Sequence, residues 1–349
     1  MRVAILAPVI MARDAIGADI QEMARNLREC GCEVRLFSDA RSQAIEEVAP
    51  YTTLASWLQG PDDVLIYHHS IGWAPAEALL GNLRCRRIVR YHNITPPEFF
   101  YGISRDYVRM CAAGRAEVMR LAAHPELEWM SDSSYNEDEL LSFGVPKERS
   151  CVVAPFHRMD HLLGIEADHS LLADLDEQGA KLLMVGRIAP NKGYLALIDA
   201  FACYVANYDP RAELLIVGKQ DPLLVKYRML MHERIAHYGL GTQVCVFENV
   251  TDRGLKACYE RADAMLYLSE HEGFGVPLVE AMVMSLPIVG RAIAATPYTV
   301  GDAGMLWDGA DPRAYAASLA RLRSDPRLRQ QLVDAGHARY ERMFARDVL

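Results

Sequence analysis

The stretch Glu272-Gly273-Phe274-Gly275-Val276-Pro277-Leu278-Val279-Glu280 joins a predicted strand to a predicted helix. Residues 264–269 before it form a short, continuous apolar run, which is typical of a strand buried inside a parallel sheet. Residues 279–284 favour a helix, and Pro277 suits the first helical position because its missing N–H would have no partner there. This strand–loop–helix unit is the repeating element of α/β folds.

The loop in this unit has the features of a ligand site. Gly273 and Gly275 allow the backbone to approach a ligand closely, and the free N–H groups of the first helical turn form an anion site. Glu272 stands in the loop and Glu280 lies one turn into the helix, so each carboxylate could hold hydroxyls on one side of a bound diphosphate. A nucleotide sugar has this layout. The alternative is a solvated loop acid followed by an ordinary polar helix residue.

A second charged loop, Gly186-Arg187-Ile188-Ala189-Pro190-Asn191-Lys192-Gly193, follows a predicted strand at 181–186. Arg187 offers a planar fork of donors, and Lys192 offers a mobile point charge. Ligands of open α/β sheets bind at the carboxyl ends of the strands. The two cations are therefore placed to hold a diphosphate and to stabilise it as it leaves. The alternative is a pair of solvated surface charges.

Strands alternate with helices along the chain, which predicts an α/β fold with parallel, doubly wound sheets. The length of 349 residues suggests two domains, and a polar stretch at 155–178 separates two strand–helix series. The expected division is 1–165 for a first Rossmann-like domain, 166–330 for a second, and 331–349 for a C-terminal helix.

The two charged loops, in this order, resemble the signature of the family 4 retaining glycosyltransferases, also called group 1 glycosyltransferases. The loop at 186–193 is similar to the Gly-Arg-x-x-x-x-Lys-Gly element of that family. The resemblance implies the GT-B fold, in which two Rossmann-like, doubly wound domains face each other across a cleft. It implies that the first domain binds the acceptor, that the second binds the nucleotide sugar, and that the helix at 331–349 crosses back to the first domain.

The reaction implied by the resemblance moves a hexose, with retention, from a nucleoside-diphosphate sugar to an acceptor hydroxyl of a polysaccharide, glycolipid or related glycan. The first expectation is mannose from GDP-mannose, followed by glucose or N-acetylglucosamine from a UDP donor. No paired carboxylate for a double displacement is visible in the sequence, which favours a front-face route. Two other interpretations stay open: a GT-B epimerase or phosphorylase, and a non-catalytic nucleotide-sugar-binding protein.

The resemblance also assigns roles to single residues. His92 follows a predicted strand at 87–91 and is expected to contact the transferred sugar; Glu272, Arg187 and Lys192 complete the expected catalytic set. The expected donor-binding residues are Gly17, Arg187, Lys192, Asn249, Val250, Glu272, Gly273, Phe274, Gly275, Leu278, Val279 and Glu280.

Three further polar residues lie at predicted strand or helix ends in the first half. Asp19 either faces the ligand or is an ordinary acid in a first helical turn, where negative charge is favourable. His68 and His69 end another predicted strand and stand as acceptor-side residues.

Composition and motif content indicate which partners and cofactors are not expected. The net charge of −9 gives no indication of a nucleic-acid partner, and the Rossmann dinucleotide fingerprint is absent. Asp174-Leu175-Asp176 is interpreted as a solvated face, and because Arg187 and Lys192 can supply positive charge, no obligatory metal or other cofactor is expected. The eight cysteines form no Cys-x-x-Cys pair, and no signal peptide or apolar run of about 18 residues is visible, so a cytoplasmic protein is expected.

An excess of arginine in the first half suggests peripheral contact with an anionic membrane at its inner face, near a lipid-linked acceptor, because such lipid attracts each nearby arginine by about 1 kcal/mol. The alternative is a solvated helix face with ordinary salt bridges. The arginines concerned are Arg84, Arg86, Arg87, Arg90, Arg105, Arg109, Arg115 and Arg120.

Overall fold

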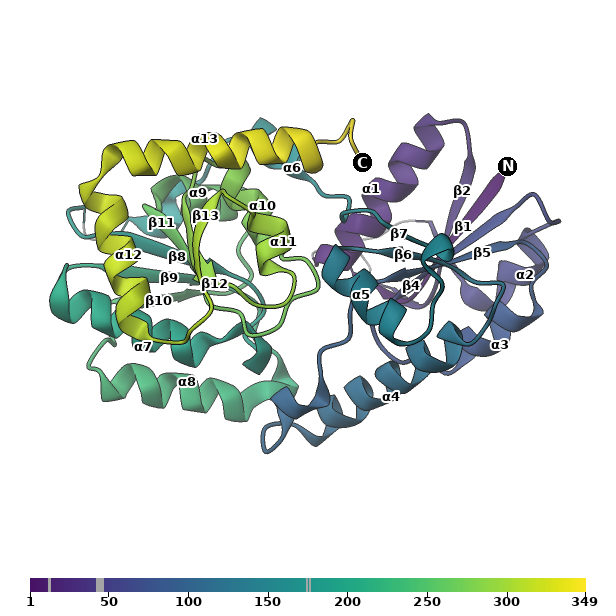
Figure 1. Cartoon of the computed structure of the whole chain (residues 1–349), viewed down its shortest axis with the longest axis horizontal. Helices are drawn as coiled ribbons and strands as arrows, with labels where there is room; N and C mark the ends of the chain where they lie inside the picture. Colours follow the sequence, from purple (N-terminus) through teal and green to yellow (C-terminus); the bar gives the residue numbers. More distant parts are fainter. Residues whose placement is uncertain (12–13, 42–46, 174, 176) are drawn as a thin grey trace. The chain divides into compact units, whose positions relative to one another are not determined.

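The computed structural model describes residues 1–11, 14–41, 47–173, 175 and 177–349. These residues form two compact units, each with helices flanking a parallel sheet (Figure 1). The first unit is Met1–Glu98 with Asp106–Arg158 and Leu349, and the second is Phe99–Arg105 with Met159–Val348. The division falls seven residues before the expected one at 165/166, because helix α6 (Met159–Gly164) packs against α9 (Asp252–Arg261) of the second unit.

The first sheet has, in the described part of the chain, the strand order β3-β2-β1-β4-β5-β6-β7, with every neighbouring pair parallel. Its strands are β1 (Arg2–Ile10), β2 (Glu33–Arg41), β3 (Val48–Pro50), β4 (Val64–His69), β5 (Arg86–Tyr91), β6 (Glu128–Ser131) and β7 (Ser150–Val152). Central strands such as β4 are buried along their whole length, as expected when helices cover both faces.

The helices of the first unit follow from its apolar periodicity. In α1, Ile20 and Met23 lie on one face and pack against Val3 and Ile5 of β1. The helices are α1 (Ala15–Glu29), α2 (Leu54–Trp57), α3 (Pro75–Asn82), α4 (Arg105–Ala122) and α5 (Ser134–Ser142), with 3-10 turns at Tyr51–Thr53, Pro97–Phe100 and Lys147–Arg149.

The second sheet has the order β10-β9-β8-β11-β12-β13 and is again parallel. Its strands are β8 (Lys181–Val185), β9 (Glu213–Val217), β10 (Val244–Phe247), β11 (Ala264–Tyr267), β12 (Ile288–Arg291) and β13 (Gly304–Trp307). Beyond α6 and α9, its helices are α7 (Tyr194–Asn207), α8 (Val225–His237), α10 (Val276–Val283), α11 (Thr296–Val300), α12 (Pro312–Ser324) and α13 (Pro326–Met343), with 3-10 turns at His169–Leu172, Pro190–Lys192 and Pro222–Leu224.

The predicted α/β class with two doubly wound parallel sheets is confirmed. In each sheet the strand order reverses between two central strands, β1 and β4 in the first and β8 and β11 in the second. Such switch points are where ligands bind in open α/β sheets. The C-terminal helix expected at 331–349 is α13, which begins earlier, at Pro326, and packs against α10 and α12 of the second unit.

The loops that follow β8 and β11 touch each other at the second switch point. Gly193 has a φ of +67°, and a Cβ built on it would lie 2.0 Å from the carbonyl oxygen of Leu268. The carbonyl of Asn191 accepts hydrogen bonds from the N–H groups of Glu270 and His271, at 2.8 and 3.1 Å. A glycine at 193 is therefore required both by its backbone conformation and by this close approach.

Replacing Gly193 by alanine is expected to destabilise the second unit more than replacing Gly239. Gly239 also has a φ of +67°, but a Cβ there meets nothing within 4 Å. Gly239→Ala should therefore cost only about 1–2 kcal/mol for the left-handed conformation, whereas Gly193→Ala should add about 1–3 kcal/mol of steric strain. Urea denaturation followed by circular dichroism measures both variants, and equal midpoints would contradict the close approach.

Candidate functional site

The second switch point carries an ion pair between a buried carboxylate and a partly exposed lysine. Lys192, in the loop after β8, places its Nζ 2.6 Å from Oε1 of Glu272, in the loop after β11. The hydroxyl of Tyr267 donates to the same oxygen at 2.6 Å. Burial by itself raises the pKa of Glu272, but the Lys192 ammonium and the hydrogen bonds from Lys192, Tyr267 and Ser269 hold that pKa below its ordinary value. Glu272 is therefore an ionised carboxylate in a largely buried position.

Arg187 lies in the same β8–α7 loop as Lys192 but faces solvent. Its side chain is 41% exposed, and Nη1 lies 3.8 Å from Oδ2 of Asp221. The structure thus brings Lys192 and Glu272 into direct contact and leaves the Arg187 guanidinium on the accessible side of the loop. Such a guanidinium offers a planar fork of donors that matches the geometry of a phosphate.

Helix α10 begins directly after the other loop, the one that follows β11 and contains Glu272. Gly275 caps the helix with a φ of +91°, and Pro277 is its second residue, one position later than the sequence predicts. Glu280 accepts a hydrogen bond from the Tyr259 hydroxyl at 2.6 Å. Burial raises the pKa of Glu280, and the Tyr259 bond offsets this only in part. Glu272 and Glu280 therefore differ in charge state as the pH falls: Glu280 is protonated first.

Three of the expected donor-binding side chains belong to the core. Phe274, Leu278 and Val279 are buried, and the ring of Phe274 meets that of Phe344 edge to face at 5.4 Å. The N–H of Leu278 already donates to the carbonyl of Gly275 at 2.9 Å. At Phe274, Leu278 and Val279, a contact with a ligand would therefore have to come from the backbone and not from the side chain.

The turn after β10 holds the remaining expected donor-binding residues of this unit. Asn249 is exposed with a φ of +54°, and Val250 precedes the cap of α9 at Thr251. Asparagine is one of the few residues that adopt this backbone conformation readily. β10 is separated from β8 by β9, so this turn lies farther along the carboxyl edge of the sheet than Lys192 does.

Gly17 of the first unit lies where the end of β1 approaches α1. A Cβ on Gly17 would stand 1.8 Å from the carbonyl oxygen of Met11, and its N–H donates to the Asp14 side chain that caps the helix. This residue is therefore fixed by packing at the first switch point.

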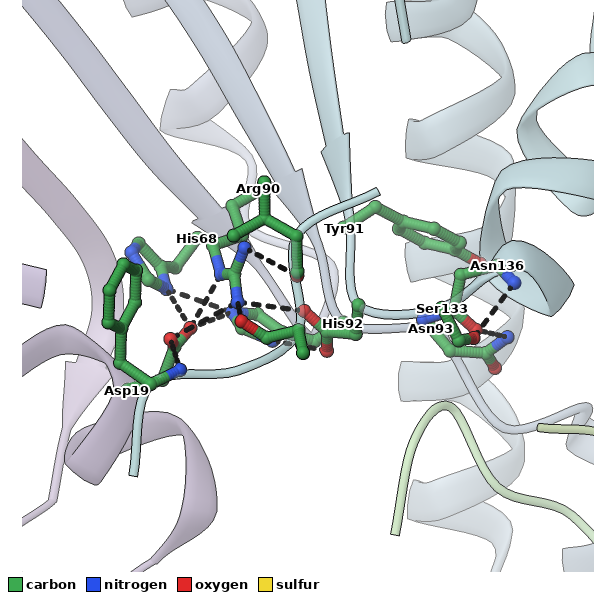
Figure 2. Close-up of polar contacts among 12 residues, drawn as sticks. Asp19, His68, Arg90, Tyr91, His92, Asn93, Ser133 and Asn136 are labelled. Carbon is green, nitrogen blue, oxygen red and sulfur yellow. Dashed lines mark hydrogen bonds and ion pairs between the residues drawn. The ribbon is translucent and has the colours of Figure 1, made fainter. Parts of the chain in front are cut away.

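A buried guanidinium organises the carboxyl edge of the first sheet (Figure 2). Arg90 of β5 donates from Nε and Nη2 to the two carboxylate oxygens of Asp19, at 2.6 and 3.1 Å. It also donates to the carbonyls of Val153 and Ala154, and Nη2 lies 3.3 Å from Oδ1 of Asp132. Burial lowers the pKa of Arg90, but Asp19 and Asp132 outweigh it, so the pKa is raised and the guanidinium stays charged.

His92 has protein partners at both ring nitrogens. Nδ1 lies 2.9 Å from Oδ2 of Asp132, and Nε2 lies 2.8 Å from Nδ1 of His68. The two imidazoles stack with ring centroids 5.0 Å apart. His92 is thus at the strand end where the sequence places it, but a ligand can reach Nε2 only if His68 gives up its hydrogen bond.

The sequence did not predict the buried charged cluster around His92, which consists of Asp19, Arg90 and Asp132. Asp19 is fully buried in an ion pair, so neither earlier interpretation, a ligand-facing acid or an ordinary first-turn acid, describes it. Assigning Arg90 to a basic surface is wrong, because its side chain is 0% exposed. Asp132, after β6, was not singled out. The available signal was a charged residue in the interior of a predicted buried strand, which requires a charged partner.

His69 belongs to a second buried cluster on the other side of the first switch point. Its Nε2 lies 3.2 Å from Oε1 of Glu117 in α4, which also accepts from the Tyr67 hydroxyl and, through Oε2, from the N–H of Trp73. This cluster fixes α4 against β4 and the loop that follows it.

Of the other seven arginines assigned to the expected membrane surface, four form ion pairs. The pairs are Arg86–Glu128, Arg87–Glu126, Arg115–Glu139 and Arg120–Glu77. These contacts neutralise much of the positive charge on which the expected membrane surface depended.

One group of described residues could hold a metal ion. Asp19, His68 and His92 offer ligand atoms that all lie within 4.8 Å of one another. The Asp19 oxygen in that group already accepts the hydrogen bond from Nε of Arg90, whose positive charge opposes a cation there. Asp174 and Asp176 lie outside the described residues.

Two doubly wound parallel sheets with charged loops at their switch points define an α/β protein with the GT-B fold, which solved structures share. Residues 173–339 match the family described as glycosyl transferases group 1. This part of the chain is therefore similar to the group 1 glycosyltransferases, the family that the two charged loops resemble.

Relatives cover part of the chain, mostly at modest identity. The D-inositol 3-phosphate glycosyltransferase of Salinispora tropica is 32% identical over 180 residues, which are 50% of this chain and 37% of that protein. The serotype-specific mannosyltransferase WbdA of Escherichia coli is 36% identical over 118 residues, 32% of this chain and 13% of that protein. The matches thus span half or less of these relatives' lengths.

Solved structures show the same fold over nearly the whole chain. Sucrose-phosphate synthase from Thermosynechococcus elongatus superposes with a TM-score of 0.77 at 18% identity, covering 99% of this chain and 95% of that one. HepE from Anabaena, in complex with UDP-glucose, superposes with a TM-score of 0.73 at 18% identity, covering 98% and 95%. Among the described helices, none has the length and apolar character needed to cross a bilayer.

Removing the buried guanidinium should cost far more than removing an exposed one on the same strand. Arg90→Met leaves Asp19 and Asp132 without their shared cation, so we expect a loss of about 3–5 kcal/mol. Arg86→Met breaks only the exposed pair with Glu128, which should cost at most about 1 kcal/mol because solvent screens it. Thermal denaturation compares the two; similar melting temperatures would show that Arg90 does not hold this edge together.

Proposed function

We propose that the chain transfers a hexosyl group from a nucleoside-diphosphate sugar to an acceptor hydroxyl. The main observation that supports this proposal is the ion pair between Lys192 and the buried carboxylate of Glu272 at the β8/β11 switch point. A carboxylate kept ionised in a buried site accepts hydrogen bonds from sugar hydroxyls, and the adjoining ammonium attracts phosphate. The match of residues 173–339 to a glycosyltransferase family supports the same chemistry.

The donor would lie along the loops at the carboxyl edge of the second sheet. Lys192 and Arg187 would hold the diphosphate and stabilise it as it departs, Glu272 would hold the sugar, and Glu280 would hold the ribose. Gly273 and Gly275 would admit the phosphates to the start of α10, and the turn at Asn249 and Val250 would meet the base. His92 of the first unit, near Gly17, would contact the transferred sugar. The roles of the first domain in acceptor binding and the second in donor binding follow from this assignment.

The proposed stereochemistry is retention by a front-face route. In that route the leaving phosphate helps to deprotonate the acceptor, and the protein acts by positioning and by stabilising the diphosphate. No metal is proposed for donor binding, because Arg187 and Lys192 supply the positive charge that a cation would bring.

Mannose from GDP-mannose is the first proposed donor, and a UDP-sugar is the second. The mannosyltransferase name of WbdA supports the former, and the UDP-glucose complex of HepE supports the latter. The acceptor is proposed to be a glycan or lipid-linked glycan.

Thermal-shift screening against a panel of GDP- and UDP-sugars ranks the donors. Turnover of the best donor without an acceptor would favour an epimerase, and a ligand bound but never turned over would favour a non-catalytic binding protein.

The proposed location is the cytoplasm, with peripheral contact at the inner face of an anionic membrane. Within the part of the chain that the structure describes, Arg84, Arg105 and Arg109 are the members of the expected arginine surface that form no ion pair, and they remain as its cations. The ion pairs favour the alternative, a solvated helix face. Co-sedimentation with anionic vesicles at low salt separates the two.

Removing the two loop cations should weaken binding of nucleoside diphosphates. Each of Arg187→Ala and Lys192→Ala removes a charge-assisted contact worth about 1.5–3 kcal/mol, which corresponds to roughly 10- to 150-fold in affinity. Calorimetry with GDP and UDP in the presence of EDTA measures this and tests metal independence at the same time. Lys226→Ala, on exposed α8, is the control and should bind as wild type. Unchanged affinity in the Arg187→Ala/Lys192→Ala double variant would contradict the phosphate assignment.

Nucleotide affinity should depend on pH through Glu280. The pKa of Glu280 is raised in the free protein, whereas a ribose hydroxyl prefers the ionised carboxylate as acceptor. Affinity is therefore fully present above the raised pKa and falls as the pH drops through it. Glu280→Gln should bind about 10-fold more weakly at neutral pH and lose this component of the pH dependence. Nucleoside diphosphates titrate as well, so the informative quantity is the difference between wild type and variant; parallel pH curves would remove Glu280 from the ribose.

A further inference from the structure

The hydrogen bonds of His92 determine which of its ring nitrogens carries the proton. Nδ1 lies 2.9 Å from a carboxylate oxygen of Asp132, and Nε2 lies 2.8 Å from Nδ1 of His68. A carboxylate only accepts hydrogen bonds, so the short Nδ1 contact requires a proton on Nδ1. When His92 is neutral, Nε2 is then a bare lone pair, and the proton in the second contact belongs to Nδ1 of His68.

The state of His68 agrees with this arrangement. Burial, followed by the neighbouring His92 and Arg90, holds the pKa of His68 well below its ordinary value, so this imidazole is neutral and carries one proton. With that proton on Nδ1, its Nε2 is an unprotonated nitrogen, and the structure leaves this buried atom without a hydrogen-bond partner among the described residues. A lone pair without a donor costs less than a buried N–H without an acceptor, so this tautomer is favoured.

Asp132 is itself held in orientation. Its Oδ1 lies 3.3 Å from Nη2 of Arg90, while its Oδ2 faces His92. Asp132 and His92 are each only 5% exposed at the side chain, so solvent does not compete for these contacts. The charged and titratable groups that surround His92 are thus Asp19 of α1, His68 of β4, Arg90 of β5 and Asp132 after β6.

We infer that Asp132 is a positioning residue for His92: oriented by Arg90, its carboxylate fixes the tautomer with the proton on Nδ1 and so presents Nε2 as a hydrogen-bond acceptor. A ligand hydroxyl that replaces His68 at Nε2 therefore meets a lone pair. This inference rests on the proposed function of His92 as a sugar contact. It adds that His92 receives a hydrogen bond from the hydroxyl and does not donate one.

The variant Asp132→Asn tests this inference. It keeps the size of the side chain but replaces one accepting carboxylate oxygen by a donating N–H₂ group. The positive charge of Arg90 lies 3.3 Å from Oδ1 of Asp132 and attracts an oxygen, so the oxygen of the new amide should face Arg90 and the amide N–H₂ should face His92. Nδ1 of His92 would then have to accept, and the ring would switch to the tautomer with the proton on Nε2. The corresponding aspartate-to-asparagine change in serine proteases acts through the same wrong tautomer of the catalytic histidine.

Imidazole ¹⁵N spectra of histidine-labelled protein read the tautomer directly. The His92 resonances are identified among the eleven histidines by their loss in His92→Ala. We expect a protonated Nδ1 and a bare Nε2 in the wild type, and the reverse in Asp132→Asn. Turnover by Asp132→Asn should fall at least about 10- to 100-fold, the loss typical when the residue that orients a metal-binding histidine is changed, while the donor KM and the affinity for nucleoside diphosphate stay within about twofold.

Ser133→Ala is the matched control. Ser133 is the adjacent buried residue, and its Oγ caps α5 by accepting from the N–H of Asn136 at 3.3 Å. This variant should lower thermal stability but leave the His92 tautomer and turnover as in the wild type, which separates positioning from loss of structure.

The outcomes distinguish the inference from the proposed function. If His92→Ala keeps wild-type turnover, the sugar contact proposed for His92 fails, whereas the spectra still decide whether Asp132 sets the tautomer. If His92→Ala loses turnover but Asp132→Asn keeps both its turnover and the wild-type tautomer, the inference is overturned. A wild-type spectrum that shows the proton on Nε2 alone would overturn it as well.

Discussion

A single buried guanidinium holds together the edge of the first unit where its site is built. Arg90 donates hydrogen bonds to both oxygens of Asp19 on α1 and to the carbonyls that follow β7, and it forms an ion pair with Asp132 after β6. A charge placed in the interior is tolerated only when it is paired and fully hydrogen-bonded. Because these partners come from separate segments, satisfying Arg90 fixes the positions of all of them, and Asp132 in turn orients His92.

The second unit also has an ion pair at its switch point, but this pair is more accessible to solvent. Lys192 and Glu272 pair at the point where the strand order reverses, and Gly193 allows their two loops to touch. This pair is partly accessible through Lys192, whereas the Arg90 cluster is closed. The difference fits their proposed tasks: the lysine has to exchange its partner for a phosphate, but Arg90 has only to keep its neighbours in place.

The protein thus has two charged loops, after β8 and β11, that suit the proposed nucleotide-sugar donor. It also has one histidine, His92, that is held in a fixed orientation. Neither requires a side chain with unusual reactivity. The proposed transfer reaction is of the kind in which positioning and stabilisation of the leaving diphosphate provide most of the rate enhancement. The buried position of Phe274, Leu278 and Val279 supports this view, because a rigid core beneath the loop keeps its backbone groups in place.

The sequence alone determined the α/β class, the two sheets and the charged loops at their strand ends, because apolar runs, glycines and prolines act locally and are read from neighbouring residues. It also located Glu272, Lys192, Glu280 and His92. It did not indicate the edge strands β3 and β13, which are short and partly exposed and so leave little pattern. Above all, it did not pair Arg90 with Asp19 or His92 with Asp132. These partners lie 71 and 40 residues apart, so only the tertiary structure, through the cost of leaving a charge buried and unpaired, decided that they meet.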